Sequence, residues 1–283
     1  ALAATPKDLF GICVVATSGD VFSIGDTEYE FSIQSISKPF VFALVSQALS
    51  CQQARYKIGV NATGLPFNSV MAIELNESRT MNPMVNAGAI ATTSLVPGAT
   101  AEEKWQFIHD GLSRLAGRRL TLNTEVYESE AASNQRNQGI AHLLEGYGRM
   151  YFDPLQATDV YTKQCSLNVS VRDLAVMGAT LADGGVNPLT KERVLDADRC
   201  KRVLAALATA GLYEESGDWL YEVGLPGKSG VSGGIVTVAP GKGGLATFAP
   251  QLDSAGNSIK GQLVTKFLSE RLGLNLFASQ AAA

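Results

Sequence analysis

Strand signals at both ends of the chain, with helical signals between them, limit the possible folds more than any other feature of this sequence. Each strand signal is a short apolar or alternating run bounded by turn residues. The strands are predicted at residues 9–16, 21–24, 29–33, 221–225, 234–239 and 244–249. Short turns at residues 17–20 and 240–243 join two neighbouring pairs as hairpins. Because such hairpins are antiparallel, we expect a mostly antiparallel sheet.

Helical patterns fill the middle of the chain and follow the last strand. The helices are predicted at residues 35–49, 86–94, 101–115, 125–147, 170–181, 198–209 and 260–272. We therefore expect an α/β fold with a mostly antiparallel sheet flanked by helices and an inserted all-helical domain, for which 283 residues suffice. Residues 1–50 and 200–283 would form the discontinuous sheet domain and residues 51–199 the helical domain. The active site would lie in the cleft between them.

Charge and hydropathy exclude several classes of partner. Hydrophobic residues make up 46% of the chain, charged residues 18%, and the net charge is −4. Lys and Arg are scattered, which argues against nucleic acid and against an anionic membrane surface. No apolar run approaches the roughly 20 residues of a membrane span, and the N-terminus lacks the pattern of a signal peptide. These features predict a cytoplasmic protein.

Cysteine and histidine are too sparse for a metal centre. The two histidines, His109 and His142, fall in helical patterns, and no Cys-x-x-Cys pair occurs. We therefore expect no metal and no cofactor. A Ser-His-Asp triad is also hard to build, so a serine hydrolase on this chain would more naturally use lysine. Free thiols are expected rather than disulfides at Cys13, Cys51, Cys165 and Cys200.

A serine and a lysine three residues apart open the first predicted helix. In Ser35-Ile36-Ser37-Lys38, positions i and i+3 place the hydroxyl and the amine on one helix face. The N-terminus of a helix also offers N–H donors to a developing anion. Acyl transfer needs a nucleophile, a base and oxyanion donors. One such spacing is expected by chance in roughly every chain of this size, so the pattern needs support from elsewhere.

Two further boxes follow in a meaningful order. Ser166-Leu167-Asn168 lies in the helical block, and Lys228-Ser229-Gly230 opens a strand-rich region. S-x-x-K, S-x-N and K-[ST]-G in this order resemble the motifs of serine β-lactamases and penicillin-binding proteins. The resemblance implies a β-lactamase/transpeptidase-like fold. Ser166-Leu167-Asn168 alone is equally typical of a helix cap followed by a loop Asn.

Longer segments are similar to one family within that superfamily, the serine-dependent glutaminases. The likeness runs from about residue 6 to residue 272, with the segments in family order. The segments are residues 31–38 (FSIQSISK), 82–90 (NPMVNAGAI), 128–137, 161–166, 211–213 and 228–234 (KSGVSGG). The resemblance implies an amidohydrolase that converts L-glutamine to L-glutamate and ammonia. It also implies a homo-oligomer, either a dimer or a tetramer.

The resemblance assigns a role to each matching position. Ser35 would be the nucleophile, Lys38 the base and Tyr213 a proton carrier near the nucleophile. The N–H groups of Ser35 and Val231 would form the oxyanion hole, and Lys228 and Gln34 would support the site. The amino-acid head of glutamine would be held by Asn86, Glu130, Asn137 and Tyr161.

Physical chemistry adds two requirements to these roles. Lys38 must be neutral to act as a base, so its pKa must fall by about 3 units through burial or a nearby cation such as Lys228. Glu130 and Asn137 are seven residues apart, so on one helix they would share a face and form one binding wall. Glu130 could pair with the substrate ammonium, and the Asn amides could donate to its carboxylate.

One feature of the family has no counterpart in the sequence. The family carries a tyrosine in a Tyr-Ile-Pro segment that by spacing would precede Ala1. Either the sequence begins too late to include it or the protein works without it, and the missing initiator Met favours the former. Two alternatives to a glutaminase stay open. One is another S-x-x-K amidohydrolase or D,D-peptidase, and the other is a non-catalytic amino-acid-binding relative.

Overall fold

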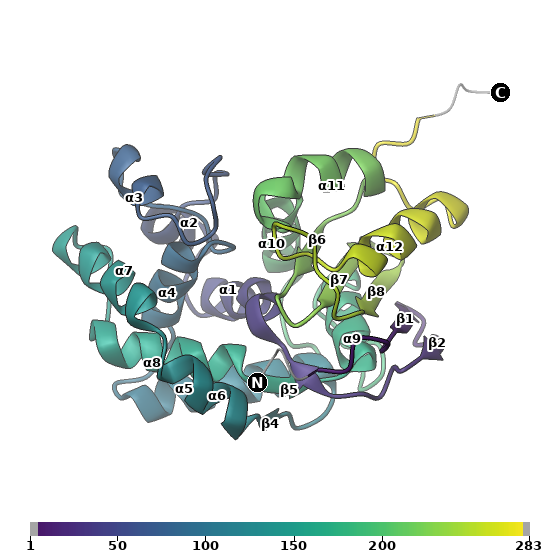
Figure 1. Cartoon of the computed structure of the whole chain (residues 1–283), viewed down its shortest axis with the longest axis horizontal. Coiled ribbons are helices and arrows are strands. Elements are labelled where there is room, and N and C mark those ends of the chain that lie inside the picture. The colour runs from purple at the N-terminus through teal and green to yellow at the C-terminus, as the bar shows by residue number, and fades with distance from the viewer. Residues whose placement is uncertain (1–4, 280–283) are drawn as a thin grey trace.

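The computed structural model describes residues 5–279 and contains a five-stranded antiparallel sheet (Figure 1). Its strand order is β2-β1-β8-β7-β6. The strands are β1 (Gly11–Ala16), β2 (Val21–Gly25), β6 (Gly227–Ser229), β7 (Gly234–Ala239) and β8 (Gly243–Phe248). Because β1 pairs with β8, for example Cys13 opposite Ala246, both ends of the chain build one sheet. The predicted α/β fold with an antiparallel sheet is confirmed.

A second, short sheet anchors the segment that leads into the Ser-x-x-Lys motif. It has the order β3-β5-β4 and consists of β3 (Phe31–Ser32), β4 (Thr121–Leu122) and β5 (Leu167–Val169). The Ile33 N–H continues the pairing by donating to the Leu167 carbonyl over 2.8 Å. The chain therefore enters the motif from a position held by hydrogen bonds to a distant strand.

The helices divide between the two sides of the molecule in Figure 1: α2 to α8 gather on one side, and α10 to α12 lie with the sheet on the other. Local capping sets several ends; Thr100 and Glu103 form a capping box at the start of α5, and Gly117 ends it in the left-handed conformation. The helices are α1 (Ser37–Ala48), α2 (Cys51–Ile58), α3 (Met71–Leu75), α4 (Asn86–Ser94), α5 (Ala101–Ala116), α6 (Thr124–Ala131), α7 (Gln135–Gly146), α8 (Pro154–Cys165), α9 (Val171–Ala182), α10 (Ala197–Ala210), α11 (Ser216–Val223) and α12 (Ile259–Arg271).

Helix α9 packs directly on the sheet. A Cβ on Gly244 of β8 would lie 2.3 Å from the Ala175 carbonyl oxygen, and one on Gly178 would lie 3.3 Å from the Gly244 Cα. Two glycines thus let the helix and the strand approach closely. The sequence places this helix in a separate domain of residues 51–199, but the packing groups it with the sheet. The domain bounds themselves stay a prediction, and α9 packs on β1, β7 and β8.

Residues 125–147 form two helices, α6 and α7, where the sequence predicts one. The chain leaves the helical path between them, at residues 132–134. The Ser133 hydroxyl donates to the Ser129 carbonyl over 3.0 Å, and the Asn134 backbone has a non-helical ψ of 16°. Ser and Asn side chains compete in this way for backbone hydrogen bonds and weaken a helix interior.

Residues 221–225 were predicted as a strand, and this prediction is wrong. Residues 221–223 complete α11, in which Trp219 and Val223 are buried one turn apart while Tyr221 is 85% exposed. Helix α11 ends at Gly224, whose φ of 68° is left-handed. The alternation of apolar and polar residues over this short segment therefore fits a helix end as well as a strand.

Candidate active site

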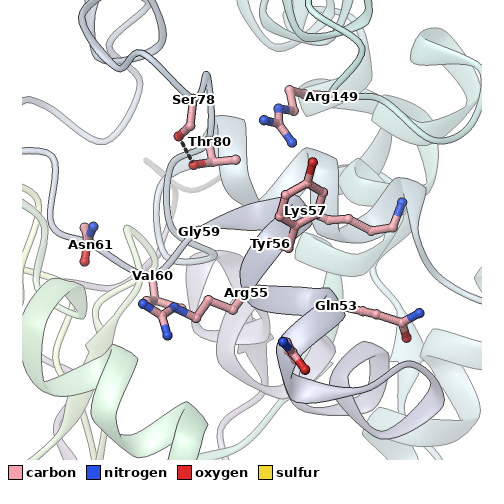
Figure 2. A pocket seen from close by; sticks show the side chains of 11 residues that line it. Gln53, Arg55, Tyr56, Lys57, Gly59, Val60, Asn61, Ser78, Thr80 and Arg149 are labelled. Carbon is pink, nitrogen blue, oxygen red and sulfur yellow. Dashed lines mark hydrogen bonds between the residues drawn. The ribbon is translucent and has the colours of Figure 1, made fainter.

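A hollow beside α2 is the wrong place for the predicted chemistry. It has a volume of about 580 Å³ and is lined by Arg55, Lys57, Thr80 and Arg149, among others (Figure 2). The hydroxyls of Ser78 and Thr80 on its wall bond each other at 2.6 Å. None of the predicted site residues lines this hollow, and its wall holds no serine next to a buried amine. The site must be located from the Ser-x-x-Lys motif itself.

Ser35 lies in a sharp turn between β3 and α1. Residues Gln34–Ile36 form one 3-10 turn, and Gln34 has a φ of 51°, a strained value for a residue with a side chain. The Ser37 hydroxyl bonds the Gln34 carbonyl over 2.8 Å and closes the turn. The end of β6 presses against it, because a Cβ on Gly230 would lie 3.2 Å from the Ile33 carbonyl oxygen. The turn presents Ser35 with 9% of its surface exposed.

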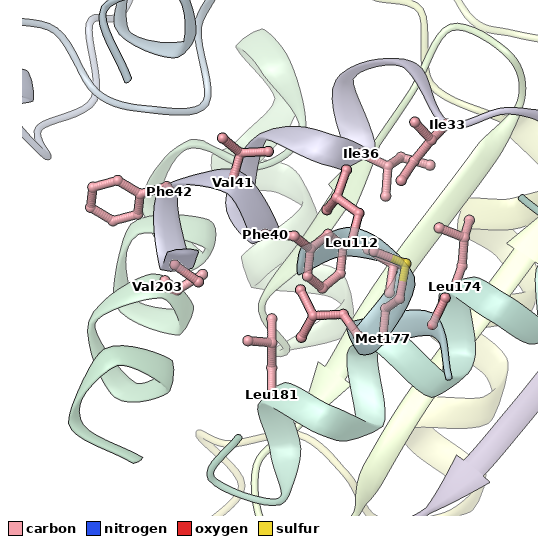
Figure 3. Packing of buried hydrophobic residues seen from close by; sticks show 14 of the residues in the cluster. Ile33, Ile36, Phe40, Val41, Phe42, Leu112, Leu174, Met177, Leu181 and Val203 are labelled. Carbon is pink, nitrogen blue, oxygen red and sulfur yellow. The ribbon is translucent and has the colours of Figure 1, made fainter. Parts of the chain in front are cut away.

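The packing below this turn is continuous with the main core. Figure 3 shows Ile33, Ile36 and Phe40 beside Leu112 of α5 and Met177 of α9, all fully buried. Helix α1 is buried all round from Ser37 to Ser46, which is typical of a central helix. A nucleophile at the start of such a helix has a fixed position, because the close-packed core resists displacement.

Lys38 is buried one turn beyond Ser35, with 1% of its surface exposed. Its Nζ donates to the Asn86 Oδ1 over 2.7 Å and to the Met84 carbonyl over 3.3 Å. Burial lowers the pKa of Lys38 from 10.5 to about 8, since it penalises the ammonium form. The amine is therefore partly neutral near physiological pH, as a general base requires.

Lys228 lies close by but is not the source of that pKa shift. It is fully buried in β6, donates from Nζ to the Ser229 carbonyl over 2.7 Å and lies 4.3 Å from the centroid of the Tyr213 ring. Burial, with a smaller contribution from the charge of Lys38, lowers the pKa of Lys228 well below its usual value. Lys228 itself therefore tends toward the neutral form. The lowered pKa of Lys38 therefore comes from burial and not from the charge of Lys228.

Tyr213 opens the 3-10 turn before α11, and its ring packs against Phe67 with the centroids 4.7 Å apart. Its φ of 54° is strained, it is 9% exposed, and its hydroxyl donates to the Ser229 carbonyl over 3.4 Å. Burial raises the pKa of Tyr213 to about 12, and hydrogen bonding with Ser35 and Ser229 offsets part of the rise. Tyr213 is thus neutral near physiological pH, the form in which a tyrosine can donate a proton.

The proposed oxyanion donors are free in the structure. Val231 is half-buried in the tight turn after β6, which the Gly233 N–H closes by donating to the Gly230 carbonyl over 2.9 Å. Among residues 5–279, neither the Ser35 N–H nor the Val231 N–H donates a hydrogen bond to another protein group. One donor belongs to Ser35 and the other follows Gly230, which packs against the Ser35 turn, and an oxyanion hole requires backbone donors without protein partners.

Asn86 connects the base to the predicted head-group residues. Besides accepting from Lys38, it donates from Nδ2 to the Asn137 Oδ1 over 3.0 Å, and the Tyr161 hydroxyl donates to its Oδ1 over 3.4 Å. Three predicted residues from α4, α7 and α8 thus meet beside Lys38. Tyr161 is 4% exposed, and burial raises its pKa well above the usual value.

Glu130 faces the same group of residues from α6. It is half-buried, and its negative charge contributes to the raised pKa values of Tyr161 and Cys165. None of the ion pairs in the part of the chain that the structure describes includes the Glu130 carboxylate. The prediction that Glu130 and Asn137 share one helix is wrong, because the break at residues 132–134 separates them. Glu130 therefore lies on α6 and Asn137 on α7, two consecutive helices.

The second motif, Ser166-Leu167-Asn168, is not part of the site. Asn168 sits in β5, where it accepts from the Asn123 amide over 3.0 Å and donates to Thr121 over 3.3 Å. The Ser166 hydroxyl returns to the Thr162 carbonyl over 2.9 Å. Ser166 is the C-cap of α8, as the helix-cap interpretation expects, but Asn168 lies in β5 and not in a loop. The bonds of both side chains stay within this local structure, which argues against a correspondence to the S-x-N box of β-lactamases.

Two other expectations concern groups around the site. Gln34 donates from Nε2 to the Ser32 hydroxyl over 3.2 Å and is 6% exposed, so its supporting role stays a prediction. The tyrosine that the resemblance places before Ala1 lies outside the described residues. Sequence reasoning missed the Met84 carbonyl as a partner of Lys38; the Pro83-Met84 stretch carries no chemical signal, since only a backbone atom is used.

The described residues contain no other obvious reactive centre. All four cysteines are free thiols. Within residues 5–279, no three His, Cys, Asp or Glu side chains are grouped so that they could hold a metal ion. No helix in this range has both the length and the apolar character that crossing a membrane requires.

A cavity of about 300 Å³, lined by Phe67, Met84 and Tyr213 among others, borders the site on the side of α10.

The fold and the site together define a hydrolase of the β-lactamase-like superfamily, in which a serine and a lysine begin a buried helix beside an antiparallel sheet. The family model described as Glutaminase matches residues 1–277. "Glutaminase 2" of Yersinia pestis is 68% identical over 99% of this chain and 82% of that protein. The chain belongs to the glutaminase family, the amidohydrolases that act on L-glutamine, and the prediction of this family is confirmed.

Solved structures agree with this assignment. The structure named "Probable glutaminase ybaS" has a TM-score of 0.96 and 48% identity, over 98% of this chain and 90% of that one. "Mglu in its glutamate form" has a TM-score of 0.93 and 38% identity, over 99% of this chain and 65% of that one. The match over nearly the whole chain extends to both sides of the site.

Proposed function

We propose that this chain hydrolyses L-glutamine by acyl transfer through a γ-glutamyl ester on Ser35. One observation carries the proposal: the amine of Lys38 is buried one turn from the Ser35 hydroxyl, with a pKa of about 8. A buried amine of this kind has little use in a purely structural helix, where a hydrophobic residue would pack at lower cost. It is well suited to remove a proton from a neighbouring hydroxyl.

In the first step, the neutral Lys38 amine takes the Ser35 proton as Oγ bonds to the side-chain amide carbon of glutamine. The carbonyl oxygen becomes an oxyanion, which the N–H groups of Ser35 and Val231 stabilise. The carbon–nitrogen bond then breaks, and the leaving nitrogen takes a proton from the Tyr213 hydroxyl. Lys38 then gives Tyr213 the proton that it took from Ser35. Ammonia departs and the γ-glutamyl ester remains on Ser35.

In the second step, water replaces ammonia. Lys38 accepts a proton from the water as its oxygen bonds to the ester carbon, and the same two N–H groups stabilise the second oxyanion. The bond to Ser35 Oγ breaks, the proton returns to that oxygen, and glutamate leaves. No cofactor and no metal is needed, because the proton that leaves with ammonia comes from Ser35 through Lys38 and Tyr213, and water supplies the proton that restores Ser35.

Four side chains would hold the amino-acid head of glutamine and are called the head-group wall here: Asn86, Glu130, Asn137 and Tyr161. This wall explains why the substrate would be an amino acid. The Glu130 carboxylate pairs with the substrate ammonium, and the Asn137 amide and Tyr161 hydroxyl bind its carboxylate end. Asn86 joins this wall to Lys38, so binding the head group and orienting the base are linked. The relative named "Mglu in its glutamate form" supports a site of this family that holds glutamate. Substrate would enter where the helical region meets the sheet. A cytoplasmic location and a dimeric or tetrameric state stay predictions from the sequence.

An ammonia-release assay with three substrates tests the activity. Glutamine, asparagine and a penicillin surrogate are compared at equal concentration, with the purified protein at fixed pH. Turnover of glutamine well above both others is expected, because only glutamine spans from the head-group wall to Ser35. Turnover of the penicillin surrogate would instead favour a peptidase or β-lactamase, and no turnover of any substrate would favour a binding protein.

Replacing Glu130 with glutamine is expected to raise the KM for glutamine by about 10- to 100-fold, because a charged hydrogen bond is worth roughly 1.5–3 kcal/mol. The kcat should change less, since Glu130 does not reach the reacting carbon. Initial rates over a range of glutamine concentrations measure both. Glu128→Gln on the exposed face of the same helix is the control and should leave KM unchanged. An unchanged KM in Glu130→Gln would rule out its proposed pairing with the ammonium.

A further inference from the structure

Asn257, a residue without a role in the reaction described above, bridges two parts of the site. It is fully buried, and its Oδ1 accepts the Ser229 hydroxyl of β6. Its Nδ2 donates to the Glu215 carboxylate over 3.1 Å, and Glu215 belongs to the same 3-10 turn as Tyr213. We infer that Asn257 is a positioning residue that holds β6 and the Tyr213 turn at the spacing needed for proton transfer next to Ser35. The inference rests on the function proposed above.

The loop that carries Asn257 is fixed by one carboxylate. The Asp253 Oδ1 accepts the N–H groups of Ala255, Gly256 and Asn257 over 3.0, 2.9 and 2.9 Å. The Asp253 N–H donates to the Asn257 carbonyl over 2.9 Å, and the Gln262 amide of α12 donates to the Asp253 Oδ2 over 2.7 Å. Residues 253–257 therefore form a closed loop tied to a helix, which can hold the Asn257 amide in one place.

The same loop touches the reacting side of the site directly. A Cβ on Gly256 would lie 3.5 Å from the Val231 Cγ1 and 3.7 Å from the Tyr213 Cε2. The loop thus packs against the residue whose N–H faces the oxyanion and against the proposed proton donor. Its position affects both groups together.

The Ser229 carbonyl explains how Asn257 acts at a distance. This carbonyl accepts from Lys228 over 2.7 Å and from the Tyr213 hydroxyl over 3.4 Å. The Ser229 side chain, which stands at the second position of the Lys-Ser-Gly motif, points to Asn257 instead of toward Ser35. Asn257 therefore holds Ser229 by its side chain, and Ser229 holds Tyr213 by its backbone.

Tyr213 needs such support because its backbone is strained. A φ of 54° is unfavourable for an aromatic residue and persists only where neighbouring contacts hold it. The Ser216 hydroxyl holds one side of the turn, donating to the Tyr213 carbonyl over 2.8 Å and accepting the Leu212 N–H over 3.0 Å. The bond from Asn257 to Glu215 holds the other side.

Kinetics of Asn257→Ala test the inference. We expect kcat for glutamine to fall by about 10- to 100-fold, since small displacements of reacting groups cost rates of this order. The KM should change by less than about threefold, because Asn257 bonds none of Asn86, Glu130, Asn137 and Tyr161. Ser229→Ala should lower kcat less, and the double variant should match Asn257→Ala, because both changes break the same bond.

A matched control separates positioning from general stability. Asn187 is equally buried and makes four side-chain hydrogen bonds, to the backbone of Arg114, Leu115, Leu189 and Thr190. Asn187→Ala should lower the melting temperature while leaving the kcat of the folded protein unchanged. If Asn257→Ala keeps its kcat, or if kcat and KM change as in Asn187→Ala, the inference is wrong.

Two further outcomes complete the test. If Asn257→Ala does not fold, Ser229→Ala carries the decision: a lower kcat at unchanged KM supports the inference, and an unchanged kcat overturns it. Ser35→Ala is measured alongside. An inactive Ser35→Ala beside a fully active Asn257→Ala overturns only the role of Asn257, whereas an active Ser35→Ala overturns the proposed acyl transfer itself.

Discussion

Replacing Ser35 with alanine is expected to lower kcat for glutamine by at least about 10⁴-fold, since removing the nucleophile of a serine hydrolase has effects of that order. The change deletes the atom that bonds the substrate carbon and leaves the backbone of the turn in place. The Gln34–Ile36 turn is held by the Ser37 hydroxyl and by Gly230, not by the Ser35 side chain. The melting temperature should therefore stay within a few degrees of the wild type, and glutamine should still bind.

Ammonia release and calorimetric binding measure the two effects separately. Ser46→Ala is the matched control, because Ser46 is a buried serine of α1, the helix that follows the Ser35 turn, and its hydroxyl has no partner within the described residues. It should keep full turnover. Intact-protein mass spectrometry of rapidly quenched wild-type enzyme should show an added γ-glutamyl group that Ser35→Ala lacks. Turnover retained by Ser35→Ala would remove this residue from the mechanism.

Lys38 is expected to control the pH dependence of turnover. Because its pKa is about 8 and only the neutral amine can accept a proton, kcat/KM should rise with pH and level off above that value. Lys38→Met should lower kcat by about 10³-fold or more and abolish this rise. Rates of ammonia release over a pH series measure both. A wild-type profile that is flat through this range would contradict the role of Lys38 as the base.

The same substitution is expected to stabilise the fold near neutral pH. In the unfolded chain Lys38 has a pKa of 10.5, so burial that lowers it to about 8 costs roughly 3 kcal/mol wherever both states are protonated. That cost is present below about pH 8 and is relieved as the pH rises toward 10.5. Lys38→Met should therefore raise the melting temperature at pH 7. The loss of the two hydrogen bonds from Nζ makes this rise smaller, and the rise should also shrink at alkaline pH. A larger gain in alkali than at pH 7 would contradict this account.

The parts of the fold that follow from neighbouring residues could be predicted. The hairpins at both ends follow from alternation and turn residues, and α9 starts where the Ser170–Asp173 capping box indicates. The helix predicted from residue 35 is present, but α1 begins at Ser37 after one 3-10 turn. Two predictions about helices were wrong. The helix break before α7 arises because the Ser133 side chain competes for a backbone hydrogen bond. Helix α11 forms because Trp219 and Val223 are buried on the same face.

The candidate site was predicted only as a set of residues. The spacing of Ser35 and Lys38 indicates a pair on one helix face, but it does not say whether that face is buried. Asn86, Asn137 and Tyr161 come from three helices, and their hydrogen bonds to one another have no signal in the sequence. Asn257 lies 28 residues after Ser229 in the chain. The two meet because β7 and β8 bring the chain back past the end of β6.

The sequence by itself therefore determined the antiparallel hairpins, the family and the order of the reactive residues, because these depend on side chains that are close along the chain. Only the tertiary structure decided that Lys38 is buried and has a lowered pKa, that Asn86 of α4 lies beside it, and that Asn168 pairs within β5. The physical reason is that burial and hydrogen bonding are properties of groups that are distant in sequence, and these groups come into contact only when the sheet and the helices pack together.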